Sequence, residues 1–148
     1  AGHGFNTNGK RSFDGSLREN EFNRAVLNKL TLLLDMNNIK YEILVPEWND
    51  VSLSSRVNRE HKINKKLKDE GFDPILISIH ANAHPNKLAK GIETFAVSEN
   101  GRYLAAFMHE ALVKSYNDST KNRGIRFLKK SYHFKTRYES VKQIITSN

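Results

Sequence analysis

Residues 74–79 read PILISI, and this nearly continuous apolar run is followed directly by the polar side chain of His80. Strands that are buried on both faces, as in a parallel sheet covered by helices, have this composition. A second apolar segment at residues 92–97, IETFAV, also predicts a strand. The two segments together predict a sheet with helices packed against it.

The segments on either side of these strands have the spacing of amphipathic helices. A loop at 3–18 precedes the first helix, which ends at Asn37 and Asn38. Its predicted buried residues are Phe22, Val26, Leu30 and Leu33. A short strand, YEILV, is predicted at 41–45, where Pro46 ends it.

Two further helices are predicted. One begins near Asp50 or Ser52, either of which can cap it, and has Gly71 at its carboxyl end. Its predicted buried residues are Leu53, Val57, Ile63 and Leu67. The other runs from about residue 102 to 116, and its predicted buried residues are Leu104, Phe107, Met108, Ala111 and Leu112.

This alternation of strands and helices predicts the α/β class: a layered sheet of mostly parallel strands flanked by helices. The 148 residues contain no repeat or linker, so we expect one domain over residues 1–148. After Gly124 the pattern weakens. Residues 126–148 are strongly basic, and a short helix or strand is predicted at 141–145.

The composition limits the chemistry. Cysteine is absent, which excludes disulfides and thiolate metal sites. No apolar run is long enough to span a bilayer. The chain shows no signal peptide and begins without Met, which is consistent with removal of a leader. The net charge of +8, from 24 basic and 16 acidic residues, favours polyanionic partners, either nucleic acid or an anionic bacterial wall.

Three residues have the types and positions of a metal site. His80 follows a strand, at the sheet edge where α/β proteins bind ligands. His3 lies between two glycines that allow a tight turn, and Glu19 begins the first helix, where the dipole favours a carboxylate. Two histidines and a carboxylate form a known catalytic zinc set, in which the metal lowers the pKa of water toward ~7 and polarises a carbonyl.

An ordinary structural role for each of these three residues stays open at this point, because they form no compact motif. The remaining histidines are expected to be structural or solvated. These are His61, His84, His109 and His133.

Several motifs resemble those of the zinc-dependent N-acetylmuramoyl-L-alanine amidases, and they occur in the order found in that family. They are Gly2-His3-Gly4, the segment 17–23 (LRENEFN), 51–56 (VSLSSR), 78–83 (SIHANA), 91–94 (GIET) and 122–125 (NRGI). Together they cover residues 1 to about 125. The resemblance implies the amidase fold, a Zn²⁺ cofactor and peptidoglycan as the substrate.

The resemblance also implies the ligands. His3, Glu19 and His80 would bind the zinc, with Glu21 as the competing second ligand. Glu19 is preferred because its distance from Phe22 and Asn23 matches the family pattern. The reaction implied is hydrolysis of the amide between the lactyl group of N-acetylmuramic acid and L-alanine. We therefore expect a monomeric autolysin or endolysin that is secreted, periplasmic, wall-associated or released by a phage at lysis.

Two departures from the family are visible. The family has a strand directly before its Gly-His-Gly motif, where this chain has one residue. Near its carboxyl end the family has a general acid/base glutamate in a Val-Glu-x-Gly-Phe strand, whereas this chain ends TRYESVKQIITSN. Glu139 is the only carboxylate after Asp118, so it is the one local substitute.

Two other function classes are compatible with these observations. A catalytically silent domain that binds zinc and wall glycan would explain the missing glutamate motif. A nucleic-acid-binding module would explain the charge, but the basic residues are dispersed and no stacking or recognition-helix pattern accompanies them. Specific nucleic-acid binding is therefore not expected, whereas anionic wall polymers remain expected partners.

Overall fold

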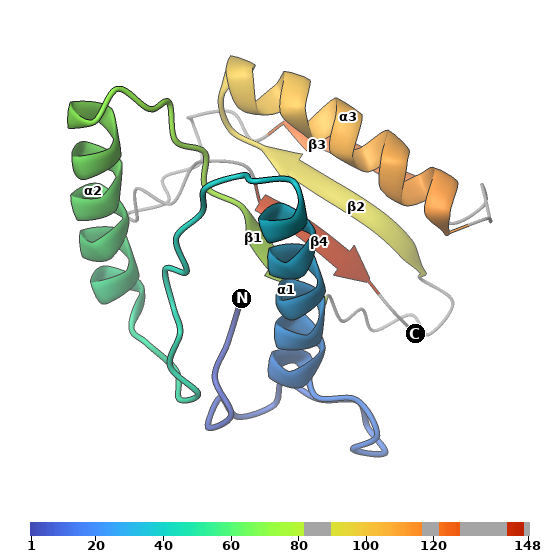
Figure 1. Ribbon diagram of the computed structural model, residues 1–148. Helices are drawn as coiled ribbons and strands as arrows, with labels where there is room; N and C mark the ends of the chain where they lie inside the picture. The colour runs from blue at the N-terminus through green and yellow to red at the C-terminus, as the bar shows by residue number, and fades with distance from the viewer. Residues whose placement is uncertain (82–89, 117–121, 128–141, 147–148) are drawn as a thin grey trace. The chain divides into compact units, whose positions relative to one another are not determined.

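The computed structural model describes residues 1–81, 90–116, 122–127 and 142–146. By its internal contacts the chain divides into two compact units, residues 1–74 and 75–148, which are described in turn. Figure 1 shows two helices, α1 and α2, in the first unit and the strands with α3 in the second. The predicted α/β class is confirmed.

The first unit contains helices α1 (Glu19–Met36) and α2 (Leu53–Asp69). As predicted, α1 gives way to Asn37, and Ser52 caps α2, its hydroxyl accepting a hydrogen bond of 3.2 Å from the backbone N–H of Ser55. Gly71 follows α2 with φ of +85°, a left-handed conformation that glycine adopts without strain. The local sequence therefore determines where α2 begins and ends.

Two predictions about the first unit are wrong. Leu33 and Leu53 were expected in the buried stripes of their helices, but they are 57% and 59% exposed. Tyr41–Val45 has no strand hydrogen bonding among the described residues and is irregular. Its alternating pattern suits a strand, but a strand forms only where another strand pairs with it, and a local pattern does not reveal the partner.

The second unit is built on a sheet with the strand order β1-β4-β2-β3. The strands are β1 (Ser78–His80), β2 (Gly91–Ala96), β3 (Asn122–Phe127) and β4 (Lys142–Thr146). β1 pairs with β4 and β2 with β3 in parallel, whereas β2 and β4 are antiparallel. The sheet is thus mostly parallel, as predicted, and β4 lies in the segment for which a helix or a strand was expected.

The PILISI run forms less strand than predicted. β1 is limited to Ser78–His80, and Ile75 is 63% exposed. Only the three residues that pair with β4 are extended in a ladder, with His80 opposite Ile144. The predicted strand at 92–97 is confirmed as β2, whose residues Gly91–Thr94 and Ala96 are buried.

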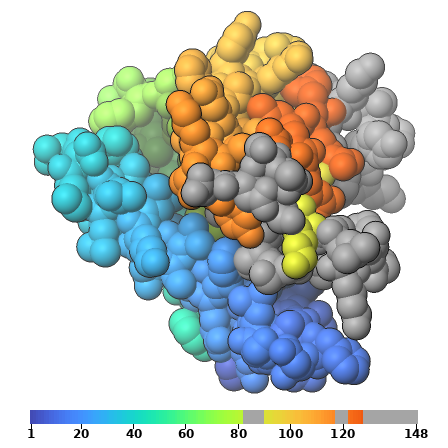
Figure 2. Space-filling model, turned by 90° about the vertical axis from the view of Figure 1, so that its right-hand side faces the viewer, coloured from blue at the N-terminus to red at the C-terminus, as the bar shows by residue number. Residues whose placement is uncertain are grey.

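Helix α3 (Glu99–Ser115) packs on β2 and β3. It begins three residues earlier than predicted, because the Ser98 hydroxyl caps it by accepting from the N–H of Gly101 at 3.0 Å. The predicted buried stripe is wrong: the face toward the sheet consists of Gly101, Ala105 and His109, spaced four residues apart. Its outer face is open to solvent (gold to orange in Figure 2), and Phe107 is 73% exposed there.

Candidate metal centre

His3 lies in a backbone conformation that side-chain-bearing residues rarely adopt. Its φ is +57°, in the left-handed region. Such a conformation persists only where the surroundings determine it, and it is concentrated at functional sites. The neighbouring Gly4 is packed so tightly that a Cβ built there would lie 2.0 Å from the backbone nitrogen of Asp50. Gly4 therefore serves a close backbone approach as well as the turn that follows His3.

Helix α1 anchors the first side of this loop. The amide nitrogen of Asn23, which is fully buried, donates to the carbonyl of Gly2 at 3.0 Å. Arg24 donates to the carbonyl of His3 at 3.1 Å and, from its other terminal nitrogen, to the carbonyl of Glu47. His3 is therefore fixed from both flanking carbonyls although it lies close to the start of the sequence.

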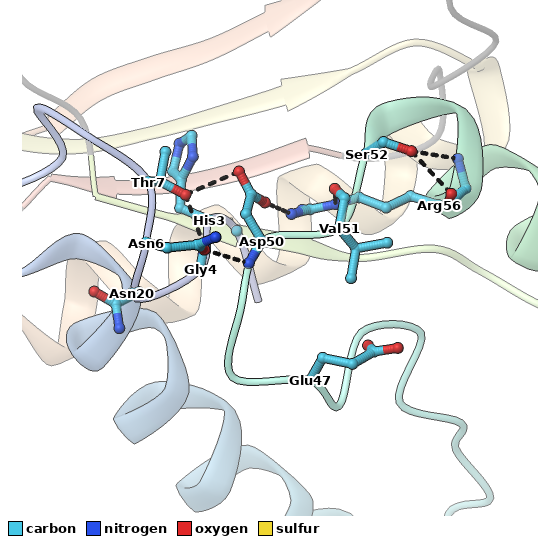
Figure 3. Close-up of polar contacts among 12 residues, drawn as sticks. His3, Gly4, Asn6, Thr7, Asn20, Glu47, Asp50, Val51, Ser52 and Arg56 are labelled. Atoms are coloured by element: carbon cyan, nitrogen blue, oxygen red, sulfur yellow. Dashed lines mark hydrogen bonds and ion pairs between the residues drawn. The ribbon is translucent and has the colours of Figure 1, made fainter.

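The 46–52 segment anchors the second side (Figure 3). The Thr7 hydroxyl accepts from the N–H of Gly4 at 3.0 Å and donates to a carboxylate oxygen of Asp50 at 2.8 Å. The backbone N–H of Asp50 donates to Asn6 at 2.7 Å. Arg56, which is buried, pairs with the other Asp50 oxygen and donates to the carbonyl of Val51 at 2.7 Å.

Electrostatics favour an ionised Asp50 in this network. Burial works against the charged carboxylate, but the Thr7 hydrogen bond and the positive charge of Arg56 are among the interactions that outweigh it. The pKa of Asp50 therefore lies below its ordinary value. The ionised Asp50 keeps both the Thr7 and the Arg56 contacts at neutral pH.

Glu19 is brought next to His3 within the first unit. It is the first residue of α1 and only 8% exposed, and its carboxylate oxygen lies 3.6 Å from Nε2 of His3. Its backbone N–H donates to the carbonyl of Lys10, which ties the helix start to the loop. Glu21 is exposed and pairs instead with Arg18 at 3.9 Å. Of the two glutamates weighed from the sequence, Glu19 is the one beside His3.

An aromatic pair lies two residues beyond His3. The N–H of Phe5 donates to the carbonyl of Trp48 at 2.9 Å, and the two rings are stacked with centroids 6.5 Å apart. The guanidinium of Arg24 lies 5.3 Å from the centre of the Trp48 ring, within cation–π range. The same arginine thus contacts the His3 backbone and the Trp48 ring.

In the second unit, His80 is the last residue of β1 and is half-buried. It stands at the carboxyl end of a strand that runs parallel to β4, as the sequence predicted. Among the other histidines, His61 is exposed, whereas His84 and His133 lie outside the described residues. The candidate acid/base Glu139 also lies outside them.

His109 has the structural role expected of it. It is 5% exposed, and its ring nitrogens contact the Thr94 hydroxyl at 3.0 Å and the side-chain oxygen of Asn122 at 2.7 Å. The Asn122 oxygen also accepts from the N–H of Gly124 at 2.8 Å. The imidazole therefore joins α3 to β2 and β3 through hydrogen bonds.

A buried carboxylate on β2 escaped the sequence analysis. Glu93 is 2% exposed and forms ion pairs with Arg126 and, at 3.5 Å, with Arg123. A charged residue in the middle of an otherwise apolar strand was the available signal. Thr7, Arg24 and Asp50 were missed as well, because polar residues in loops are common and their partners are distant in the sequence.

Comparison with known proteins decides the family. A family model for N-acetylmuramoyl-L-alanine amidases, Amidase_3, matches residues 1–143. The chain belongs to this amidase family. The match continues beyond residue 125, where the motifs recognisable by eye stop. The protein is therefore an amidase, a hydrolase whose substrate class is peptidoglycan.

Two solved structures of amidases share the fold. One is the catalytic domain of CwlV, an N-acetylmuramoyl-L-alanine amidase from Bacillus (Paenibacillus) polymyxa var. colistinus. It is 24% identical with a TM-score of 0.75, over 97% of this chain and 75% of that one. The other is the N-acetylmuramoyl-L-alanine amidase AmiC2 of Nostoc punctiforme, 22% identical with a TM-score of 0.73, over 96% and 73% of the two chains. No curated protein matches the chain.

Proposed function

We propose that this amidase is zinc-dependent and hydrolyses the amide between the lactyl group of N-acetylmuramic acid and L-alanine. His3, Glu19 and His80 would hold the metal. The observation that carries the proposal is the His3–Glu19 pair, in which a buried carboxylate lies 3.6 Å from an imidazole nitrogen. The family supplies the reaction class.

The geometry of this pair suits zinc. A separation of 3.6 Å is longer than an ordinary hydrogen bond between nitrogen and oxygen. Zinc binds nitrogen and oxygen at about 2.0–2.2 Å in a tetrahedron, so two of its ligand atoms lie about 3.4 Å apart. Histidine and glutamate both bind zinc. The site would therefore not require cysteine, which this chain lacks. The pair therefore fits two corners of a zinc site.

His80 is the proposed third ligand. It ends β1, at the strand edge where α/β folds bind ligands, and it is half-buried. Glu19 is preferred to Glu21, since Glu21 is exposed and paired with Arg18. Three protein ligands would leave one coordination position open for water, which is the arrangement of a catalytic rather than a structural site.

Zinc bound there would supply a water of lowered pKa and polarise the substrate carbonyl. The chain's own residues would position these groups: His3 and Glu19 are fixed by the α1 and 46–52 contacts, and the dipole of α1 favours the ionised form of Glu19. Glu139 is the candidate for proton transfer. Loss of a general acid/base costs on the order of 10²–10⁴ in rate.

We infer that the enzyme acts on the bacterial wall as a monomeric autolysin or endolysin, in a secreted, periplasmic or wall-associated location. Its charge of +8 would help it approach anionic wall polymers. None of the described helices has the length and apolar character needed to cross a bilayer. Binding to whole walls should weaken strongly as salt is raised; salt-independent binding would contradict the electrostatic part of the proposal.

A second candidate is a catalytically silent domain that binds zinc and wall glycan. The observation that favours it is the carboxyl-terminal sequence TRYESVKQIITSN, which lacks the family's Val-Glu-x-Gly-Phe motif. Such a protein would take up zinc and bind walls without releasing new amino groups.

The deciding experiment is incubation of the protein with purified peptidoglycan, followed by measurement of newly exposed alanine amino groups with and without a chelator. Chelator-sensitive release that is lost in His80→Ala supports the zinc amidase. Release that persists in the chelator contradicts zinc dependence. Zinc uptake without release favours the silent domain. If release is observed, Glu139→Gln tests the proposed proton transfer and should slow the release by about 10²–10⁴-fold.

A further inference from the structure

The contacts around His3 fall into two sets. Those from α1 reach the carbonyls of Gly2 and His3, and they come from side chains of the same helix that carries Glu19. Those from the 46–52 segment reach the other side of the turn through the Phe5 N–H, the Asn6 side chain and the Thr7 hydroxyl, and only the hydroxyl also holds the amide of Gly4. The hydrogen bond between Thr7 and Asp50 involves no residue of α1, and neither residue belongs to the proposed ligand set.

The Thr7 hydroxyl uses both of its hydrogen-bonding capacities. It accepts from the N–H of Gly4 at 3.0 Å, and it donates to Asp50 at 2.8 Å (Figure 3). The N–H of Thr7 also donates to the carbonyl of Gly4 at 3.1 Å, which closes a small turn directly after His3. The carboxylate of Asp50 therefore orients the hydroxyl, and the hydroxyl fixes the amide that follows His3.

Asp50, at the other end of this chain of contacts, is itself held by neighbouring residues. Asp50 is held by Arg56, whose side chain is only 10% exposed and which also donates to the carbonyl of Val51 at 2.7 Å. Gly4 packs against the backbone of Asn49 and Asp50 so closely that no side chain fits between them. The turn after His3 is thus packed against a backbone segment that has its own contacts with Arg56.

We propose that Thr7, Asp50 and Arg56 are positioning residues that hold the left-handed backbone of His3 before any metal binds, so that its imidazole is directed toward Glu19 in the metal-free protein. This inference rests on the proposed role of His3 as a metal ligand. Residues that do not bind the metal but orient one of its ligands commonly change metal affinity by about 10–100-fold when they are removed. The same change is expected here on loss of the Thr7 hydroxyl.

The test compares Thr7→Val, which removes the hydroxyl but keeps the shape, with Thr7→Ser, which keeps the hydroxyl. Thr31→Val is the matched control, because the Thr31 hydroxyl donates to the carbonyl of Asn28 within α1, about three turns along that helix from Glu19. Zinc affinity is measured by competition with a chelator, and the absorption spectrum of the cobalt-loaded protein reports ligand geometry. We expect Thr7→Val to lose about 10–100-fold in affinity with an altered cobalt spectrum. Thr7→Ser and Thr31→Val should match the wild type.

A second measurement needs no metal. Amide exchange at Gly4 in the metal-free protein should be roughly tenfold faster or more in Thr7→Val than in Thr7→Ser, because its acceptor is gone. The proposal would be overturned if Thr7→Val and Thr7→Ser had equal exchange at Gly4 and equal zinc affinity. It would also be overturned if both variants lost zinc affinity to the same extent. If circular dichroism shows that Thr7→Val does not fold, Asp50→Asn replaces it. Asp50→Asn should also lower zinc affinity and speed exchange at Gly4, and unchanged values would overturn the proposal.

These outcomes separate the two proposals. A wild-type protein that takes up no zinc contradicts the proposed metal site, while the Gly4 exchange contrast still tests the role of Thr7. A wild-type protein that binds zinc through His3, with Thr7→Val unchanged, contradicts only the positioning role.

Discussion

The two units of this amidase are stabilised by different kinds of contact. Among the described residues of the first unit, the buried side chains are mostly polar, namely Glu19, Asn20, Asn23 and Arg56, with Val45. Asn23 and Arg56 donate to backbone carbonyls, and Arg56 also donates to the carboxylate of Asp50. In the second unit the interior is formed by strand ladders and by apolar residues, namely Ile79, Ala81, Ile92, Ala96 and Ala105, with Glu93, Thr94 and His109 among them.

The difference teaches how each half of the proposed site is made. The conformation of His3 depends on specific polar partners, each of which contributes direction as well as energy. The placement of His80 depends on a strand ladder, which tolerates changes in side chains more readily. Substitutions in one unit should therefore leave the contacts of the other unchanged.

The largest effect is expected for Gly4→Ala. Its Cβ would lie 2.0 Å from the nitrogen of Asp50, which is backbone and cannot rotate away. We expect a destabilisation of roughly 3 kcal/mol or more, because backbone must shift. That corresponds to a fall of roughly 6 °C or more in Tm for a chain of this size, measured by thermal unfolding.

Gly9→Ala is the matched control for that substitution. Gly9 has φ of +73° and nothing near its missing Cβ, so only the left-handed conformation is penalised, at about 1–2 kcal/mol. If Gly4→Ala and Gly9→Ala melt together, the close approach of the two loops does not exist in solution. The contact of Gly4 with the backbone of Asp50 would then be wrong.

An intermediate effect is expected for His109→Phe in the second unit. The ring would be kept, but Thr94 would lose its imidazole contact and Asn122 one of its two. Leaving buried polar groups unpaired costs about 1–3 kcal/mol. Amide exchange in the first unit should not change. Faster exchange at Gly4 in His109→Phe would show that the contacts of the two units are not separate. His61→Phe, at an exposed position, should stay within about 0.5 kcal/mol of the wild type.

The smallest effect is expected for Glu47→Gln, and it should depend on pH. Hydrogen bonds from Arg59 lower the pKa of Glu47 from 4.5 to about 2. Because the folded pKa is depressed, the stabilisation is fully present above pH 4.5 and is lost as pH falls through about 2. The pair is solvent-accessible, so the difference in Tm at pH 7 should be at most about 4 °C.

Thermal unfolding of the wild type and Glu47→Gln between pH 7 and pH 2 measures this difference. It should shrink steadily below pH 4.5. A difference that stays constant over the whole range would show that charge on Glu47 is not what holds Arg59.

The sequence predicted those features that are encoded locally. Ser52 at the start of α2, Gly71 after its end and the apolar segment of β2 each carry their own signal, and each was predicted correctly. Tyr41–Val45 and the first part of the PILISI run failed because extended structure needs a pairing partner, which local composition does not reveal.

Helix α3 failed for a different reason. Its sequence contains more apolar residues than one face can bury, and the spacing alone fits several stripes. The face that packs on the sheet has the small residues Gly101 and Ala105 and the hydrogen-bonding His109, whereas the larger Phe107 is exposed. Close packing on the strands selects small side chains, and hydrophobicity does not rank them first.

For the site, the sequence supplied the residue types but not their supports. His3 and Glu19 were predicted as a pair, and they lie 3.6 Å apart. Thr7 and Asp50, which are 43 positions apart, meet only because of the fold. Contacts of that kind depend on tertiary structure, and a single sequence contains no pattern for them.

The stacking of Phe5 on Trp48 has a practical consequence. This chain contains one tryptophan, so its tryptophan fluorescence comes from a single indole. Trp48 is 56% exposed, its indole lies under the guanidinium of Arg24, and its backbone carbonyl accepts a hydrogen bond from the amide of Phe5. The protein thus carries a built-in optical reporter in contact with Phe5, which lies two residues from His3, and its emission should register any rearrangement of that loop without a label.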